Sequence, residues 1–448
     1  MTSDFSESES EKDHREYECL AEKYQETVAS APSNAVATEN LQKWLELPLS
    51  ADVSEELAAP CHRLGSAFYE LCLQAHDGAE KKTEKLQMRN FAQGVAQCVR
   101  ASSQSISRSM FRLLTSSSGA NAVSEQELRQ LLFACLAMAE DGKAGADDAE
   151  RMADVAKALA CAAMPPSAGS TQASSDDFVR WIGAQFPLLY TIFMSWMARK
   201  CFGALTKPSY LAPQLSHNSV ILSRSHFVAL AAVNSSIQTS LRRLYTSTQD
   251  GLSFNRLSYH ILGYSGPTLI VIRDTQGGVF GMYCDTEWKE SSRYYGGNGC
   301  FLFRMAPEIS IYRVTASGAN ENYMYLNSKG FALPRGLGMG GSTDKFRLFL
   351  SEDLDENSYS TPKCLSFESG RLSSSDQFVI DTIEVWGCGG EESELNQKAH
   401  RQETADLINK ARKVDKAQFL GNDFDKEFFL SKTYGHGTDK ARVADDEQ

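Results

Sequence analysis

The stretch from Leu257 to Cys388 constrains the fold of this 448-residue chain more than any other part of the sequence. It holds 16 of the 31 glycines, and much of it alternates apolar with polar residues, a period of two that is typical of strands. Short strands separated by turn-forming residues predict a mostly antiparallel pair of sheets with few helices. The predicted strands are residues 268–273, 279–283, 300–304, 309–314, 323–326, 346–350 and 378–386.

A dense glycine run, Gly336–Gly341, lies inside this stretch. It superficially resembles a dinucleotide-binding fingerprint, but it does not join a strand to a helix, and Pro334 just precedes it. Phosphate binding of that kind needs backbone amides at a helix N-terminus. We therefore interpret the run as a loop whose backbone packs closely against a sheet.

The residues in front of this stretch are helical by pattern. Residues 1–15 are rich in Ser, Glu, Asp and Lys, which predicts an acidic disordered tail. From residue 16 to 219 apolar residues recur every three or four positions, which predicts a bundle of amphipathic helices. Pro187 is expected to kink or split the helix at 178–202. Residues 220–245 also have the pattern of a helical pair.

Residues from about 110 to 202 can be aligned with two EF-hand loops, at 116–127 and 166–177. Ser124 and Glu127 form a capping-box pattern, so a helix is expected to begin there. Calcium binding needs several carboxylate oxygens around the ion, and the early ligand positions of both loops lack them. We predict a degenerate EF-hand-like pair that does not bind calcium.

Behind the glycine-rich stretch, residues 391–448 predict a charged helix, over about 391–414, and a polar tail. The helix has only a thin apolar stripe, so it is either solvated or docks on another molecule. Its four apolar positions are therefore the candidate partner-binding residues. They are Leu395, Leu407, Ala411 and Val414.

Composition and motifs exclude several classes of function. The formal net charge of −12 argues against nucleic acid as a partner. No apolar run reaches the length of a bilayer span, and no hydrolase, kinase, Walker or zinc-protease motif is present. The carboxylates Asp274, Glu287, Asp344 and Glu384 could serve acid–base chemistry, but their spacing selects no pair. We expect no enzyme activity, no cofactor and no metal.

The eleven cysteines are scattered and form no C-x-x-C pair, which favours free thiols. Cys284 and Cys300 lie beside aromatic residues in or next to predicted strands. A structural role is the first interpretation for both, because reactive thiols need a cation or a helix N-terminus close by. A redox protein that acts on peroxide through Cys284 or Cys300 remains the alternative.

The glycine-rich stretch resembles the TLDc domain family, because the family's residues recur in order along most of it. The polar helix behind and the EF-hand-like helices in front also resemble one branch, the mTOR-associated lysosomal TLDc proteins. The residues that carry the resemblance, called signature residues below, are Gly266, Pro267, Phe280, Gly281, Trp288, Gly296, Phe301, Phe303, Tyr325, Gly338, Gly340, Gly341, Glu384 and Trp386.

This resemblance implies an α+β chain, with a TLDc β-sandwich and flanking helices at 220–390. It further implies a non-enzymatic adaptor that binds subunits of the V-type proton ATPase and is linked to mTOR-type signalling and oxidation resistance. The branch's vertebrate members begin Met-Gly and can be myristoylated, whereas this chain begins Met1-Thr2. We therefore expect a cytoplasmic monomer that reaches lysosomal or vacuolar membranes only through protein partners.

Overall fold

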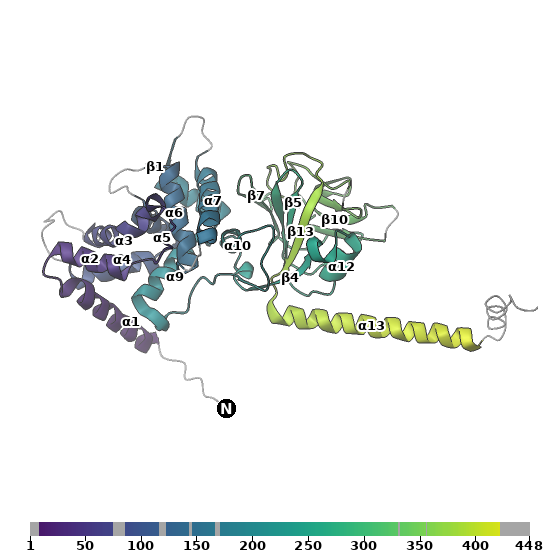
Figure 1. The fold of residues 1–448 in the computed structure, drawn as a ribbon, viewed down its shortest axis with the longest axis horizontal. Coiled ribbons are helices and arrows are strands. Elements are labelled where there is room, and N and C mark those ends of the chain that lie inside the picture. The colour runs from purple at the N-terminus through teal and green to yellow at the C-terminus, as the bar shows by residue number, and fades with distance from the viewer. Residues whose placement is uncertain are drawn as a thin grey trace, which may run out of the picture. The chain divides into compact units, whose positions relative to one another are not determined.

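The computed structural model describes residues 9–74, 86–115, 122–142, 146–165, 171–329, 332–354 and 356–421; the side chains of 9–12, 146 and 411–421 are not described. Residues up to Gly390 form one compact unit, and those from Glu391 form a second. The α+β class is confirmed: helices fill the N-terminal half, and strands dominate from residue 214 to 387 (Figure 1).

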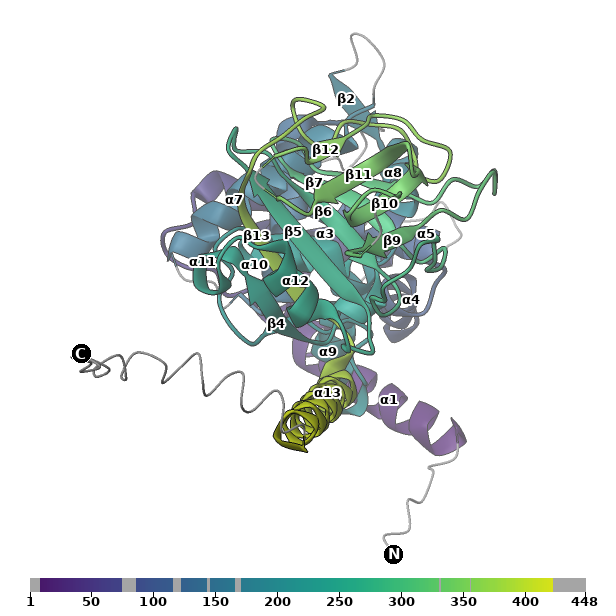
Figure 2. The ribbon, with the colours of Figure 1, turned by 90° about the vertical axis from the view of Figure 1, so that its right-hand side faces the viewer.

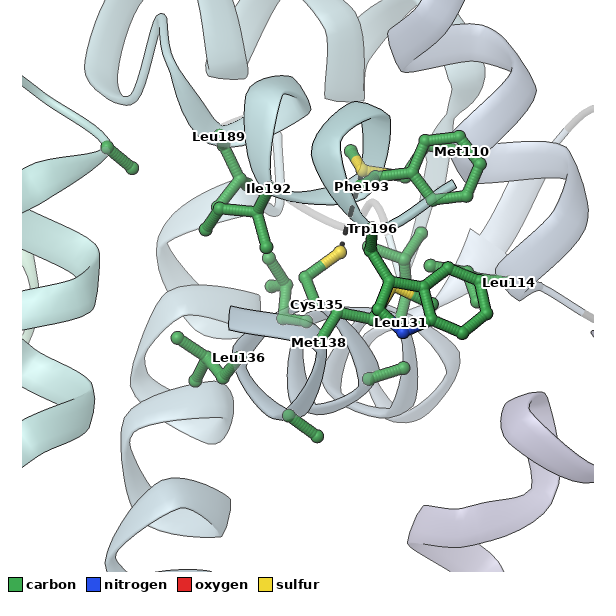
Figure 3. Packing of buried hydrophobic residues seen from close by; sticks show 14 of the residues in the cluster. Met110, Leu114, Leu131, Cys135, Leu136, Met138, Leu189, Ile192, Phe193 and Trp196 are labelled. Atoms are coloured by element: carbon green, nitrogen blue, oxygen red, sulfur yellow. Dashed lines mark hydrogen bonds between the residues drawn. The ribbon is translucent and has the colours of Figure 1, made fainter. Parts of the chain in front are cut away.

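The N-terminal half packs its helices around a shared apolar core. The helix α9, Leu189–Phe202, is apolar on nearly all sides and packs against α5 and α6 (Figure 3). In that core the Sγ of Cys135 lies 3.5 Å from the sulfur of Met110. The other elements are α1 Glu9–Tyr24, the π-helix η1 Gln25–Ala29, α2 Asn34–Trp44, α3 Glu55–Gln74, α4 Met88–Val99, α5 Ser103–Leu114, α6 Glu125–Ala139, α7 Ala146–Ala163, α8 Ser175–Gln185 and the 3-10 helix η2 Gly203–Leu205.

Two boundaries differ from the sequence prediction. Helix α1 begins at Glu9, so the predicted disordered tail is wrong for residues 9–15, while residues 1–8 lie outside the described residues. The helix expected at 178–202 starts earlier, at Ser175, and is split near Pro187 into α8 and α9, as the missing proline N–H led us to expect.

The EF-hand-like pair has the pairing expected of two such loops. Strands β1, Ala122–Ser124, and β2, Gln172–Ser174, are antiparallel, with Val123 opposite Ala173 at the eighth position of each loop. Capping boxes follow both strands, since Glu127 accepts from the N–H of Ser124 and Asp177 from that of Ser174. The early ligand positions of both loops lie outside the described residues, so the absence of calcium binding stays a prediction.

Two sheets make up the second half of the compact unit. The seven-stranded sheet has the order β3-β4-β13-β5-β6-β7-β8, and the four-stranded sheet the order β12-β11-β10-β9. In Figure 2 the four-stranded sheet lies in front of β6 and β7. The strands are β3 Gln214–Leu215, β4 Ser240–Thr246, β5 Thr268–Asp274, β6 Val279–Cys284, β7 Phe301–Ala306, β8 Ser310–Arg313, β9 Met324–Asn327, β10 Gly336–Ser342, β11 Lys345–Ser351, β12 Tyr359–Ser360 and β13 Ile380–Gly387.

Two segments that we expected to be something else are strands. The glycine run is not a loop: it forms β10, which pairs with β9 on one side and β11 on the other. The helical pair predicted at 220–245 is half wrong, because only α10, Arg224–Ala231, is an α-helix and β4 follows it. The remaining short elements are η3 Ser235–Ile237, α11 Ser247–Asp250 and α12 Phe254–Ile261.

The seven-stranded sheet is buried on both faces. One face packs against the four-stranded sheet and α12, with Ile270, Ile272 and Met282 fully buried there. The other face belongs to the core of the helical half, and the ring of Phe227 on α10 meets Trp386 edge-on at 5.2 Å. A polar contact also links the helical half to the sheet, since Gln185 Oε1 accepts from the N–H of Ile311 at 2.8 Å. The helical half therefore covers a sheet face that would otherwise meet water.

Helix α13, Gly390–Gly421, lies in the second unit except for its first residue, and it is longer than the helix predicted at 391–414. Its N-terminal turn carries Glu391 and Glu392, which complement the helix dipole. Among the described residues, no helix of the chain is both long and apolar enough to cross a bilayer.

Candidate interaction surface

Glu384, supported by Trp386 on the same strand β13, holds the segment Ser219–Val220 to the seven-stranded sheet. Glu384 is fully buried and accepts hydrogen bonds from Ser219 Oγ at 2.6 Å, from the N–H of Val220 at 2.9 Å and from Trp386 Nε1 at 3.2 Å. Three donors satisfy a carboxylate that would otherwise be costly to bury. Glu384 is therefore a structural clamp and has no free oxygen to act as a general base.

Signature residues on the β5–β7 hairpins allow close packing. A Cβ on Gly281 would lie 2.0 Å from the carbonyl of Ile270 and 2.6 Å from the ring of Phe303. The ring of Phe280 packs edge-on against Phe378, with centroids 4.9 Å apart. Phe301 stacks on Tyr283, also at 4.9 Å.

The remaining signature residues before β9 fasten the loops at the ends of the sheet. Trp288 is buried and its Nε1 donates to Thr268 Oγ1 at 2.9 Å. The carbonyl of Pro267, which follows buried Gly266, accepts from the N–H of Cys388 at 2.8 Å. Gly296 has a φ of +94°, and a Cβ there would lie 2.9 Å from the sulfur of Met324. Each of these residues therefore has a structural role in the domain.

The glycines of β10 make room for an aromatic layer on the outside of the four-stranded sheet. A Cβ on Gly338 would lie 2.5 Å from the ring of Phe346, which stacks on Phe349 at 4.6 Å. Tyr325 completes this layer, and its hydroxyl donates to the carbonyl of Pro334 at 2.8 Å. The close packing predicted for the glycine run is observed, although in a strand.

Most sheet edges in the described part of the sandwich are already occupied. The edge of β9 is paired through Tyr295 and Met324, which exchange backbone bonds of 3.0 and 2.8 Å. The β8 edge meets Glu368, whose N–H donates to the carbonyl of Arg313 at 2.9 Å, and the β12 edge meets Gln377. A partner would therefore have to bind through side chains and loops, because strand addition needs an exposed edge.

The two thiols of the redox alternative are shielded. Cys284 is fully buried, and burial raises the pKa of its thiol well above the usual value. Burial also raises the pKa of Cys300, and its Sγ donates to the Asp285 carboxylate at 3.2 Å, which raises it further. Both environments disfavour the thiolate that reacts with peroxide. The structure thus argues against a reactive role for either residue.

Among the described residues no cluster of three or more His, Cys, Asp or Glu side chains is arranged to hold a metal. The clefts on either side of Tyr295, about 510 and 320 Å³ in volume, are open and polar. Asp285 lines the smaller one, but its oxygens accept from the N–H groups of Gly297 and Gly299, both at 3.0 Å. Glu287 and Lys289 also line the smaller cleft, and the ammonium of Lys289 lies 5.1 Å from the centre of the Tyr295 ring.

His226, in the capping box of α10, is expected to make the stability of the folded chain depend on pH. The N–H of Ser223 donates to Nδ1 of His226 at 3.2 Å, and burial lowers the pKa of this imidazole to about 4. An unfolded histidine titrates near 6.5, so between pH 6.5 and 4 the unfolded state binds more protons and the folded state loses stability as the pH falls. The His226 residue keeps part of its surface in contact with solvent, so we expect a loss of about 1–3 kcal/mol across this window.

Urea denaturation at pH 7, 5 and 4 measures this loss. His226→Gln, which keeps an acceptor for Ser223, is the matched control and should lose that part of the pH dependence. An equal slope in both proteins would contradict the assignment.

Helix α13 carries the candidate partner-binding residues. Leu395 and Leu407 are 64% and 65% exposed, and Ile408, which the sequence interpretation missed, is 47% exposed. The backbone at Ala411 and Val414 is helical, but their side chains lie outside the described residues.

Not all of these positions share a face of α13. At about 100° per residue, positions 407, 411 and 414 fall within roughly 60° of one another, whereas 395 lies about 120° from 407. The apolar dipeptide Leu407-Ile408 would have been the signal for the missed residue.

Comparison with known families matches residues 215–389 to the TLDc domain. The chain is similar to a protein from Gallus gallus named MTOR-associated protein MEAK7, with 33% identity over 204 residues, 43% of this chain and 42% of the relative. The Homo sapiens protein of that name is 35% identical over 159 residues, 35% of this chain and 34% of the relative.

A human protein named Nuclear receptor coactivator 7 is 28% identical over 176 residues, which cover 39% of this chain and 18% of that protein. The matched region thus spans less than half the length of each of these relatives. The family match coincides with the two packed sheets, and the signature residues fill their cores and turns. Residues 215–389 of this chain are therefore a TLDc domain.

Proposed function

We propose that the chain is a non-catalytic adaptor that docks on the V-type proton ATPase of lysosomal or vacuolar membranes and links it to mTOR-type growth or stress signalling. One observation carries the proposal: the polar signature residues are used inside the fold, while α13 presents Leu395, Leu407 and Ile408 to solvent. Exposed large apolar residues on a long, otherwise charged helix favour a docking element. Relatives named mTOR-associated support the signalling half of the proposal.

In this proposal the chain is cytoplasmic and reaches the membrane through its partner. The TLDc domain, covered on one side by the helical half, provides a rigid body, and α13 provides a second contact. Binding of a solvent-exposed helix into a groove gains most from its few apolar anchors.

A pull-down with pump-containing membranes tests the proposal. The full chain should recover V-type ATPase subunits, and a chain ending at Gly390, which keeps the whole first compact unit, should recover at least about tenfold less, as expected from loss of anchor residues. Failure of both chains to recover the pump would end the proposal. Equal recovery by both would remove only the role of α13.

A further inference from the structure

A cavity of about 420 Å³ lies where the helical half meets the TLDc domain. Helix α10 of the domain packs there against α6 and α7 of the helical half (Figure 1), and all three helices contribute to the cavity wall. Part of the wall is polar, and part is apolar, from Ala139, Met152 and Ala212. A cavity of this size, with a mixed lining, is typical of sites that bind small molecules.

One positive group with unused hydrogen-bond donors lines this cavity. Glu140, whose side chain is only 12% exposed, accepts from Nε of Arg224 and so fixes the guanidinium in place. Nothing in the described part of the chain accepts from Nη1 or Nη2 of Arg224. Arg224 and Ser225 are also the first two residues of α10, where backbone N–H groups have no partner within the helix. This part of the wall therefore suits a carboxylate, which a guanidinium binds through two parallel hydrogen bonds.

A negative group without a partner lines the same cavity. Two of its three carboxylates are used, since Asp141 pairs with Arg199 and Glu140 with Arg224. The third, Asp148 in the first turn of α7, is exposed, and no described residue bonds to its carboxylate, Arg224 included. The C-terminal end of α6, which carries a partial negative charge, also lines the cavity. This part of the wall therefore suits an ammonium group.

We propose that this cavity binds a free α-amino acid with an uncharged side chain, with its carboxylate on Arg224 and its ammonium on Asp148. The two charged groups of the wall line one cavity without pairing with each other, so a small molecule that carries both charges is complementary to them. Glu140 is a positioning residue, because it acts through Arg224. The bound amino acid would connect α7 of the helical half to α10 of the TLDc domain. This inference goes beyond docking on the proton pump and does not depend on it.

Calorimetric titration of the full chain with single amino acids tests the proposal. The probes are L-alanine, L-serine, L-methionine and L-glutamine, which share the two charges and differ in their side chains. At least one of them should bind with a Kd of about 1 mM or below. Analogues of the tightest-binding amino acid that lack either the amino group or the carboxylate should bind about tenfold more weakly or worse, because each loses a charge-assisted contact.

Two neighbouring aspartates provide a matched pair of variants. Asp148→Asn and Asp147→Asn each remove one negative charge from the first turn of α7, but only Asp148 lines the cavity. We expect Asp148→Asn to weaken binding of the amino acid by about tenfold or more and Asp147→Asn to leave it unchanged. Arg224→Lys keeps a positive charge beside Glu140 but loses the planar fork, so it should also weaken binding by about tenfold.

Absence of binding by all four amino acids would overturn the proposal. Equal affinity of Asp148→Asn and the unaltered chain would overturn it too, because nothing would then hold the ammonium. The same holds if the analogue without an amino group binds as tightly as the amino acid, since the cavity would then be a simple anion site. Should Arg224→Lys not fold, the two aspartate variants decide, because both side chains are exposed.

Discussion

Replacement of Gly341 by alanine is expected to lower the free energy of unfolding by about 2–4 kcal/mol, through backbone strain and overpacking together. Gly341 has a φ of +83°, a backbone conformation that is energetically unfavourable for any L-residue with a side chain. A Cβ there would also lie 2.2 Å from the carbonyl of Lys345, on the paired strand β11. The backbone of β11 would have to move, and the aromatic layer over β10 would move with it.

Two other glycines are matched controls for the Gly341→Ala variant. Gly277 has a φ of +86° but no atom within 4 Å of a Cβ, so Gly277→Ala should cost only the conformational strain, about 1 kcal/mol. Gly183 lies inside α8 with free space and an ordinary φ, so Gly183→Ala should stabilise by roughly 0.5–1 kcal/mol. Urea denaturation should therefore show the largest loss of stability for Gly341→Ala, a smaller loss for Gly277→Ala and a gain for Gly183→Ala. An equal cost at Gly341 and Gly277 would mean that β10 is not close-packed.

The second large effect is expected at Glu384. Glu384→Ala empties a fully buried site and removes the acceptor for Ser219, Val220 and the buried indole of Trp386, so we expect a loss of about 3–5 kcal/mol. Glu384→Gln should lose less, because its amide oxygen can still accept from part of this set.

Asp381, three residues earlier, is the control for Glu384. Its carboxylate is 45% exposed and accepts from Arg273 Nε at 2.7 Å, so Asp381→Asn should change stability by less than about 1 kcal/mol. A small effect of Glu384→Ala would contradict the clamp, and would reopen a role for Glu384 in binding or catalysis.

The strands that the sequence predicted share one property. β5, β6, β7, β8, β9, β11 and β13 carry apolar side chains in short runs bounded by turn residues, so the pattern identifies them. β10 could not be found this way, because glycine has no side chain to create a period. β4 was mistaken for a helix because Leu241, Leu244 and Tyr245 are spaced by three and four residues, which also fits a helical face.

The candidate site was only partly predictable. The resemblance identified Glu384 and Trp386, but it did not predict that Glu384 binds Ser219, because these two residues are 165 positions apart in the sequence. The sequence analysis gave Cys284 and Cys300 a structural role first and a redox role as the alternative, and the structure buries both thiols. Their burial depends on the pairing of β6 with β5 and β7 and on the packing of the core around them, neither of which local pattern specifies.

The affinity of α13 variants for purified V-type ATPase tests the central claim most directly. Leu407→Asp and Asn409→Asp each add one negative charge to the same turn of the helix, but only the first removes an exposed apolar side chain. If α13 docks through its apolar residues, Leu407→Asp should weaken binding by about tenfold or more, and Asn409→Asp should bind like the unaltered chain. Equal affinity of all three proteins would contradict docking through this helix, and no binding by any of them would contradict the adaptor itself.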